Sequence, residues 1–255
     1  MTAHTGLDFS PAPGAAPARI RVLRHGWIET RLLARNGEQL LLALVIPIAI
    51  LIGSRFVGGD LLGDQLPSSV LALAVWSTAF TSTAIGTGFD RRYGVLERLA
   101  ATPLGPSGLV TGKSLAVVII VLGQLVILSV VALLLGWRPA FSPGSALVAV
   151  LAVVLAIGGF VSFALILAGR LRAEATLALA NVIYVVGLIG GGLVIPTDRF
   201  GPAAEPVLRL LPTAALGDGL RGAADGVSDW RCVIVLAVWA LILTLLARKA
   251  FRWIS

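Results

Sequence analysis

The sequence predicts an all-α membrane protein with six transmembrane helices. Of its 255 residues, 57% are hydrophobic and only 13% are charged, whereas about a quarter of the residues of an average soluble domain carry charge. Six segments also approach the roughly 20 apolar residues that a helix needs to cross a bilayer. These segments are residues 39–56, 68–89, 114–136, 145–168, 176–195 and 232–248.

The region before the first of these segments has two parts. Residues 1–18 are rich in proline, alanine and glycine, so we expect a disordered cytoplasmic tail ahead of a single six-span domain over residues 19–255. Residues 19–38 are predicted to form an amphipathic helix in the inner membrane interface. A plain helical lead-in to the first span is the alternative. Four apolar side chains recur there at helical spacing: Ile20, Leu23, Trp27 and Ile28.

Charge predicts the orientation of the spans. An even number of spans places both termini on one side, and fourteen of the 20 basic residues then fall on that side. The positive-inside rule assigns this side to the cytoplasm. Arginine far outnumbers lysine and alanine is abundant, which is typical of a GC-rich bacterial genome, so we expect the bacterial inner membrane. The net charge of +7 reflects this topology, and nucleic-acid binding is not expected.

The loop between the second and third spans, residues 90–113, is charged and amphipathic. Its apolar residues are predicted to share one face of a short helix that ends at Pro103, while its charged residues offer polar contacts. Such a loop is suited to contact a partner protein, and the alternative is a membrane-surface turn. The residues assigned to partner contact are Arg91, Arg92, Val95, Leu96, Glu97, Arg98 and Leu99.

A long outer segment, residues 196–231, lies between the fifth and sixth spans and is not uniformly polar. We expect two short re-entrant helices that pack on the bundle as an outer lid, because irregular backbone at membrane depth needs cover. Pro212 is predicted to stop the first helix and Thr213 to cap the second. Asp218 and Arg221 are three residues apart, a spacing that is worth a few tenths of a kcal/mol on a helix.

The chain lacks the residues of common enzymes and carriers. Thr111-Gly112-Lys113-Ser114 imitates the end of a phosphate-binding loop, but the spacing to the preceding glycines is wrong, which excludes nucleotide binding by this chain. Lys113 is expected to reach the lipid headgroups instead. Both histidines precede the first span and the span cores hold almost no ionisable groups. We therefore expect no catalytic residue, no bound cofactor or metal, and no ion-coupled transport.

Neutral polar residues do enter the predicted spans. Small and hydroxylated side chains allow close helix packing and hydrogen bonds between helices, which is the role we favour for them. The alternative is that some face a substrate pathway or a dimer interface. The candidates for that role are Ser77, Thr81, Gln124, Asn181 and Tyr184.

The loop after the second span resembles the cytoplasmic loop of ABC type-2 exporter permeases. The resemblance rests on Gly94-Val95-Leu96-Glu97-Arg98-Leu99 followed by Thr102-Pro103-Leu104. A looser match runs from Leu211 to Arg221, where Pro212, Thr213, Asp218 and Arg221 are similar to the outer segment of that family. With the six spans, the resemblance covers residues 19–255, and drug and antibiotic exporters of the daunorubicin-resistance type look most similar.

The resemblance implies a transmembrane subunit that works as a dimer, with a second copy or a paralogue. Two ATP-binding subunits, made as separate chains, would hold ATP and Mg, and the loop would be the coupling helix that rests on them. The expected function is ATP-driven export of a lipophilic or amphipathic substrate from the cytoplasm or inner leaflet. An ATP-independent small-molecule carrier or channel is the alternative.

Overall fold

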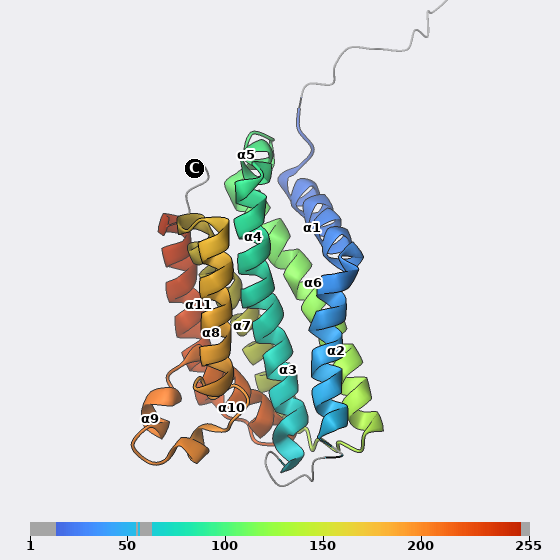
Figure 1. The fold of residues 1–255 in the computed structure, drawn as a ribbon, viewed down its shortest axis with the longest axis vertical. Coiled ribbons are helices and arrows are strands. Elements are labelled where there is room, and N and C mark those ends of the chain that lie inside the picture. Colours follow the sequence, from blue (N-terminus) through green and yellow to red (C-terminus); the bar gives the residue numbers. More distant parts are fainter. Residues whose placement is uncertain (1–13, 55, 57–62, 251–255) are drawn as a thin grey trace, which may run out of the picture.

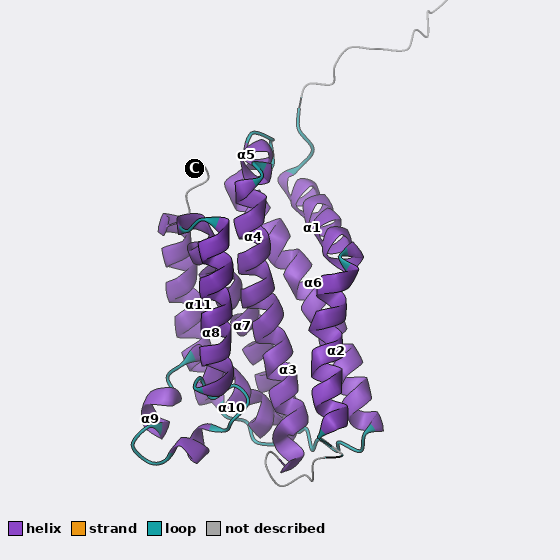
Figure 2. Ribbon diagram, viewed as in Figure 1, coloured by secondary structure: helices purple, strands orange, loops and turns teal. Residues whose placement is uncertain are grey.

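The computed structural model of the protein describes residues 14–54, 56 and 63–250, and every regular element in these ranges is a helix (Figures 1 and 2). Most of the predicted disordered tail, residues 1–13, lies outside the described residues. The elements are α1 (Ala18–Arg35), α2 (Gly37–Gly53), η1 (Gly63–Gln65), α3 (Leu66–Trp76), η2 (Ser77–Ser82), α4 (Thr83–Arg92), α5 (Val95–Ala100), α6 (Gly105–Leu134), α7 (Pro143–Arg170), α8 (Ala173–Ile189), η3 (Thr197–Phe200), α9 (Glu205–Leu208), α10 (Pro212–Ala224) and α11 (Trp230–Ala250).

The long helices stand side by side as a bundle (Figure 1). The short helix α5 lies at one end, and α9 and α10 lie at the other (Figure 1). We call these the α5 end and the α10 end. The start of α1 and the last turn of α11 are both at the α5 end, so the described chain begins and finishes on the same side of the bundle.

Four helical segments are long and apolar enough to cross a membrane: Leu66–Arg92, Ser107–Leu134, Pro143–Arg170 and Trp230–Lys249. Two shorter apolar helices, Ala43–Gly53 and Ala173–Ile189, coincide with the predicted first and fifth spans. The fifth was expected to reach residue 195. It ends at Ile189 because three glycines follow, the last of which has a φ of +68° that other residues rarely adopt.

The predicted interfacial helix corresponds to α1, which lies along α6 and leads into α2 after a break at Asn36 (Figure 1). The side of α1 that packs on the bundle is small and polar, with His25, Gly26 and Thr30 buried. The apolar side chains Leu23, Trp27, Ile28 and Leu32 are exposed. The apolar side is thus left outside the protein, and its depth in the membrane stays a prediction.

The predicted second span is one continuous rod that contains a π-helical turn. α3, η2 and α4 follow one another without a break, and η2 is the π segment. Thr83 donates its hydroxyl hydrogen to the carbonyl oxygen of Thr78, five residues earlier, at 3.0 Å. A π turn widens the helix and redirects the side chains around it. Of the hydroxyl groups near η2, that of Thr78 donates to Gln124 of α6.

The predicted coupling loop is shorter than residues 90–113, because α6 already begins at Gly105. Gly105 has a φ of +65°, and Pro106 then occupies the first turn, where its missing N–H costs no helical hydrogen bond. The non-helical part of the loop is therefore confined to the short turns on either side of α5.

The outer segment contains short helices, but their limits differ from the expected ones. Pro212 does not stop a helix: it is the first residue of α10, where proline is well tolerated. Thr213 does not cap α10, since its hydroxyl donates to the carbonyl oxygen of Gly191 at 2.8 Å. The lid is also bound to the last helix, because Trp239 Nε1 donates to the carbonyl oxygen of Leu210 at 2.8 Å.

The core forms around α7, which packs against α11, α10 and α4. Aromatic rings fill its centre: Trp76 stacks on Phe80 with ring centroids 4.4 Å apart, and its edge meets Phe160 at 4.6 Å. A Cβ atom at Gly159 would lie 3.3 Å from the Cα of Ala240, so this glycine sets the close approach of α7 and α11. A Cβ atom at Gly187 would likewise lie 3.1 Å from the indole nitrogen of Trp76.

The contrast between two neighbouring glycines gives a test of this packing. We expect Gly159→Leu to lower stability by about 1–3 kcal/mol, because the new side chain must push α11 away. Gly158→Leu is the matched control, since a Cβ there meets open space, and it should stay within about 0.5 kcal/mol of the parent. Thermal denaturation of the purified protein in detergent measures both, and equal melting temperatures would contradict the proposed contact.

Candidate functional site

The α5 end carries the predicted partner-contact residues. Gly94, with a φ of +70°, turns the chain out of α4, and α5 then runs from Val95 to Ala100. Leu96 is only 1% exposed, so it anchors α5 to its own chain instead of joining the expected partner-facing surface. Val95, Glu97 and Arg98 are exposed, and Leu99 is half-buried.

The two arginines before this turn are bound within the chain. Arg91 donates from Nη1 to the carbonyl oxygen of Ala168, at 3.3 Å, near the end of α7. Arg92 forms an ion pair with Glu174 in the first turn of α8. Both arginines thus tie the end of α4 to the turn between α7 and α8, while Glu97 and Arg98 lie further out on α5.

A buried ion cluster lies beside this turn, and the sequence analysis missed it. Lys113 was expected to reach the headgroups, yet it is only 7% exposed. Its ammonium nitrogen lies 2.7 Å from a carboxylate oxygen of Asp90 on α4 and 3.5 Å from one of Glu29 on α1. A buried ammonium needs such partners, because desolvating an unpaired charge costs several kcal/mol. The cluster therefore joins α1, α4 and α6.

His25 lies next to this cluster, with its Nε2 atom 3.7 Å from a carboxylate oxygen of Glu29. Burial lowers the pKa of His25 below its usual value, and the Lys113 ammonium lowers it further, against the opposing carboxylates of Glu29 and Asp90. A Cβ atom at Gly112 would lie 2.5 Å from the imidazole ring. Gly112 and Lys113, which imitate part of a phosphate-binding loop, thus hold α1 against α6.

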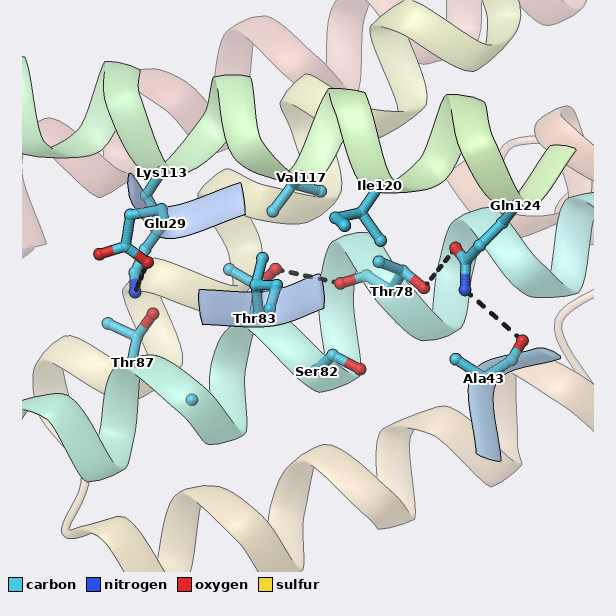
Figure 3. Close-up of a pocket in the computed structure, with 12 residues that line it drawn as sticks. Glu29, Ala43, Thr78, Ser82, Thr83, Thr87, Lys113, Val117, Ile120 and Gln124 are labelled. Atoms are coloured by element: carbon cyan, nitrogen blue, oxygen red, sulfur yellow. Dashed lines mark hydrogen bonds and ion pairs between the residues drawn. The ribbon is translucent and has the colours of Figure 1, made fainter. Parts of the chain in front are cut away.

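A narrow cavity of about 50 Å³, with a mostly apolar surface, extends from this cluster into the bundle (Figure 3). Thr78 donates to the Gln124 amide oxygen at 2.8 Å, and the Gln124 amide nitrogen lies 3.5 Å from the carbonyl oxygen of Ala43. The volume of the cavity is large enough for water molecules. It is too small for a drug-sized molecule, which needs roughly 300 Å³ or more. Hydroxyl groups of Thr78, Ser82, Thr83 and Thr87 line the wall.

Of the five candidate pathway residues, the structure brings only Gln124 into the cavity wall. Ser77 is half-buried and Thr81 is buried within η2. Asn181 is exposed on α8, and Tyr184 packs against the core. Spacing along one helix could not reveal which hydroxyl groups face the cavity, because the π turn of η2 shifts the register.

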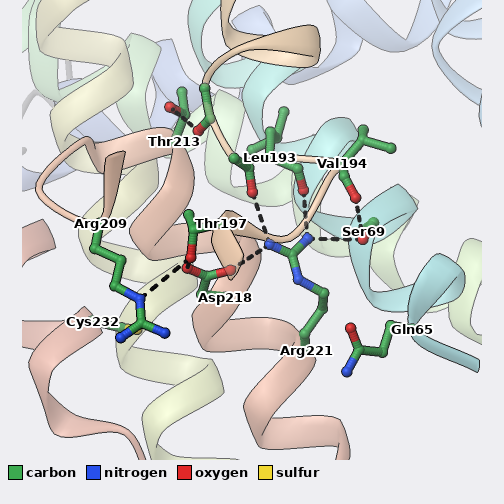
Figure 4. A network of polar contacts seen from close by, with 12 residues as sticks. Gln65, Ser69, Leu193, Val194, Thr197, Arg209, Thr213, Asp218, Arg221 and Cys232 are labelled. Atoms are coloured by element: carbon green, nitrogen blue, oxygen red, sulfur yellow. Dashed lines mark hydrogen bonds and ion pairs between the residues drawn. The ribbon is translucent and has the colours of Figure 1, made fainter. Parts of the chain in front are cut away.

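At the α10 end, Arg221 is the centre of a second buried network (Figure 4). Its side chain is 3% exposed and lies 2.6 Å from a carboxylate oxygen of Asp218. It also donates to the Ser69 hydroxyl at 2.9 Å and to the carbonyl oxygens of Gly192 and Leu193, each at 2.8 Å. The expectation of a weak surface pair was wrong, because burial and backbone acceptors make this arginine a link between α3, α10 and the chain after α8.

The rest of the lid is attached to the same network. Thr197 donates to the second carboxylate oxygen of Asp218 at 2.7 Å, and Arg209 Nε lies 3.4 Å from the Thr197 hydroxyl (Figure 4). In the part of the chain that the structure describes, no group of three or more His, Cys, Asp or Glu side chains is arranged to hold a metal ion.

Comparison with protein families identifies the chain. The sequence model of the ABC-2 type transporter family matches residues 24–224, which is well over half of the protein and includes both buried networks. The chain belongs to the ABC-2 type transporter family. A comparison with curated proteins found no match. The chain is therefore a transmembrane permease component of an ABC transporter, of the kind that normally works with ATP-binding subunits.

The match begins within α1 and ends with the last residue of α10. The family region of the permease thus contains the docked part of α1, the cluster around Lys113, the turn with α5, and the network of Arg221. Membrane components of this family are generally not catalytic, since the ATPase is in a partner chain. At the α5 end, the contacts of Arg91, Arg92 and Lys113 connect helices of the chain.

Removing the buried arginine of the permease tests the α10 end. We expect Arg221→Met to lower the stability by about 3–5 kcal/mol, because Asp218 and two backbone carbonyls lose their donor. Arg231→Met is the control, since Arg231 is exposed near the same end. This substitution should change the free energy of unfolding by about 0.5 kcal/mol or less. The measurement is thermal denaturation in detergent, and similar losses in both variants would refute the structural role.

The two lysines of the permease provide a matched pair for the α5 end. Lys113→Met leaves the carboxylates of Glu29 and Asp90 facing each other, so we expect a loss of about 3–5 kcal/mol. Adding Asp90→Asn should recover part of that loss by removing one charge. Lys249→Met, at an exposed position, should leave the melting temperature unchanged. If Asp90→Asn gives no recovery, the ion cluster is not what holds α1, α4 and α6 together.

Proposed function

We propose that this permease is the membrane subunit of an ATP-driven exporter, and that α5 is the coupling helix on which a separate ATP-binding subunit rests. The observation that carries the proposal is the position of α5: it projects from the end of the bundle (Figure 1), within the family region, with Glu97 and Arg98 on its exposed side. A short helix held by the buried Leu96 transmits a push better than a flexible loop does.

The proposed topology has six spans with both termini in the cytoplasm of a bacterial cell. α2 and α8 have 17 residues each and so measure about 25 Å, slightly less than the roughly 30 Å hydrocarbon core. Local thinning of the bilayer accommodates such short spans at modest cost. Arg91, Arg92, Arg170 and Arg172 gather at the α5 end, which supports a cytoplasmic position for that end.

Contacts within the chain provide a route from α5 into the bundle. α5 follows α4 directly, and Asp90 on α4 is joined through Lys113 to α6 and α1. A displacement of α5 is therefore transmitted to α4, α6 and α1 together. Because interfaces and packed cores switch between discrete arrangements, this connection favours a tilt of the bundle as a unit when two ATP-binding subunits close.

The cargo we propose is lipophilic or amphipathic, such as a drug, an antibiotic or a lipid-like molecule. The cavity inside one chain is too small for it, so the pathway is proposed to form between this permease and a second copy or a paralogue. The exposed faces of α6, α8 and α11 are apolar, as a surface that meets lipid or such cargo requires. ATP and Mg belong, in this proposal, to the partner subunits.

The alternative is a carrier or channel that needs no ATP. Two features of the sequence weigh against it: the span cores hold almost no ionisable groups, and the loop of residues 90–113 is suited to contact a partner protein. Glu29 on α1 and Asp90 near the end of α4 are carboxylates that lie beside Lys113, at the edge of the predicted spans. Both carboxylates, however, are bound by the lysine. They account for the docking of helices, and the described residues contain no second carboxylate pair along the cavity of Figure 3.

A charge reversal on α5 tests the coupling role. We expect Glu97→Arg combined with Arg98→Glu to reduce transport and transport-stimulated ATP hydrolysis by about ten-fold or more, because misplaced like charges at an interface cost several kcal/mol. Co-expression with a candidate ATP-binding subunit, co-purification and ATPase measurement in liposomes give the result.

The control for this test is the same exchange at the opposite end. Asp198→Arg with Arg199→Asp exchanges two adjacent exposed charges on η3 and should leave ATP hydrolysis unchanged. Both double variants should insert into the membrane in equal amounts. Full transport by the α5 variant would rule out the coupling role, and the absence of any co-purifying ATPase would rule out the exporter itself.

A further inference from the structure

A hollow of about 400 Å³ lies at the α5 end, between the last turn of α4 and the turn that joins α7 to α8. Four arginines line it: Arg91, Arg92, Arg170 and Arg172. We call it the arginine hollow. Its volume falls within the range of roughly 300–1,000 Å³ that is typical of small-molecule sites. The hollow is separate from the cavity of Figure 3.

The charge of the arginine hollow is strongly positive. Glu174 is the one carboxylate among its lining residues, and it is engaged by Arg92. The first turn of α8 also belongs to the wall, and the start of a 17-residue helix adds partial positive charge from its free N–H groups. Guanidinium groups bind phosphate through two parallel hydrogen bonds, so the chemistry of the hollow suits a phosphate group.

The shape of the hollow is fixed by close packing of its two walls. A Cβ atom at Gly88 on α4 would lie 3.3 Å from the side chain of Thr176 and 3.6 Å from the Cα of Ala173, both on α8. Arg91 adds a hydrogen bond from α4 to the end of α7. Because these contacts already hold the walls together, a ligand would enter a formed site and pay little for ordering it.

An exposed apolar surface continues from the hollow along α8. Leu179, Val182, Val186 and Ile189 follow one another at helical spacing, and all are exposed in the single chain. A ligand that suits both regions carries a phosphate at one end and hydrocarbon at the other. Basic pockets between membrane helices are known to hold the headgroups of anionic lipids.

We infer that the arginine hollow binds the phosphate headgroup of an anionic phospholipid, with its acyl chains lying along α8. The leaflet follows from the orientation proposed above and is the inner one, whereas the ligand class follows from the hollow alone. Bound there, the phosphate competes with Glu174 for Arg92, and it sits between α4 and the α7–α8 turn, next to α5. Anionic lipid is thereby placed to stabilise the α5 end.

The test measures lipid binding to the purified full-length protein. Native mass spectrometry and thermal denaturation in detergent are followed while short-chain phosphatidylglycerol is added, with phosphatidylcholine of the same chain length and inorganic phosphate as separate arms. We expect phosphatidylglycerol to bind and raise the melting temperature, and the other two to do so at least ten-fold more weakly. Equal binding of both lipids would overturn the inference, and an equal effect of inorganic phosphate would show a small-anion site instead.

Three double variants locate the site. Arg170→Gln with Arg172→Gln removes two exposed arginines of the hollow and should weaken phosphatidylglycerol binding about 25-fold, at about five-fold for each arginine. Arg170→Lys with Arg172→Lys keeps the charge and should show a smaller loss. Arg248→Gln with Lys249→Gln removes two exposed charges from the end of α11 at the same end of the bundle, outside the hollow, and should bind as the parent does.

The main competing occupant is an acidic segment of the ATP-binding subunit. If that subunit displaces phosphatidylglycerol, and Arg170→Gln with Arg172→Gln weakens subunit binding instead of lipid binding, the hollow belongs to the protein partner and the lipid assignment is wrong. The readout is lipid binding and needs no transport, so a failure here is distinct from a failure of the exporter proposal.

Discussion

A charge buried among helices must be paired, and this constraint fixes both ends of the bundle. Lys113 brings α1, α4 and α6 together through Glu29 and Asp90. Arg221 does the same at the α10 end for α3, α10 and the chain after α8. Apolar packing is not directional and would tolerate several arrangements of the helices. Few arrangements, by contrast, place hydrogen-bond partners around a buried ion. The two clusters thus select one arrangement of the helices.

One rod connects the two clusters. The segment Leu66–Arg92 carries Ser69, which accepts a hydrogen bond from Arg221, and Asp90, which accepts one from Lys113. Between them lies the π turn of η2, where Thr78 is bonded to Gln124 of α6. Because π turns recur at functional sites and at bends of helices, the middle of this rod is the natural place for a change in its shape, while its ends stay anchored.

Much of this arrangement could be predicted from the sequence, and the rest could not for a definable reason. Hydropathy and motif are local, so they indicated the apolar segments and the turn that holds α5. The partner of Lys113 on α1 is 84 residues away, and the carbonyl acceptors of Arg221 are 28 and 29 residues away. No local pattern records such pairs. The Asp218–Arg221 spacing was visible, but its strength depends on burial, which only the fold supplies.

The contacts at the α5 end favour joint movement of α1, α4 and α6. The start of α6 and the end of α4 are joined by the Lys113–Asp90 pair and to α1 by Glu29, so separating them would expose a buried charge at a cost of several kcal/mol. α5, by contrast, lies between two glycines with positive φ, Gly94 and Gly105, and is anchored by the buried Leu96. If α5 is the coupling helix proposed above, a force on it passes through α4 and the Lys113 pairs to α6 and α1 together, because separating these helices would expose a buried charge.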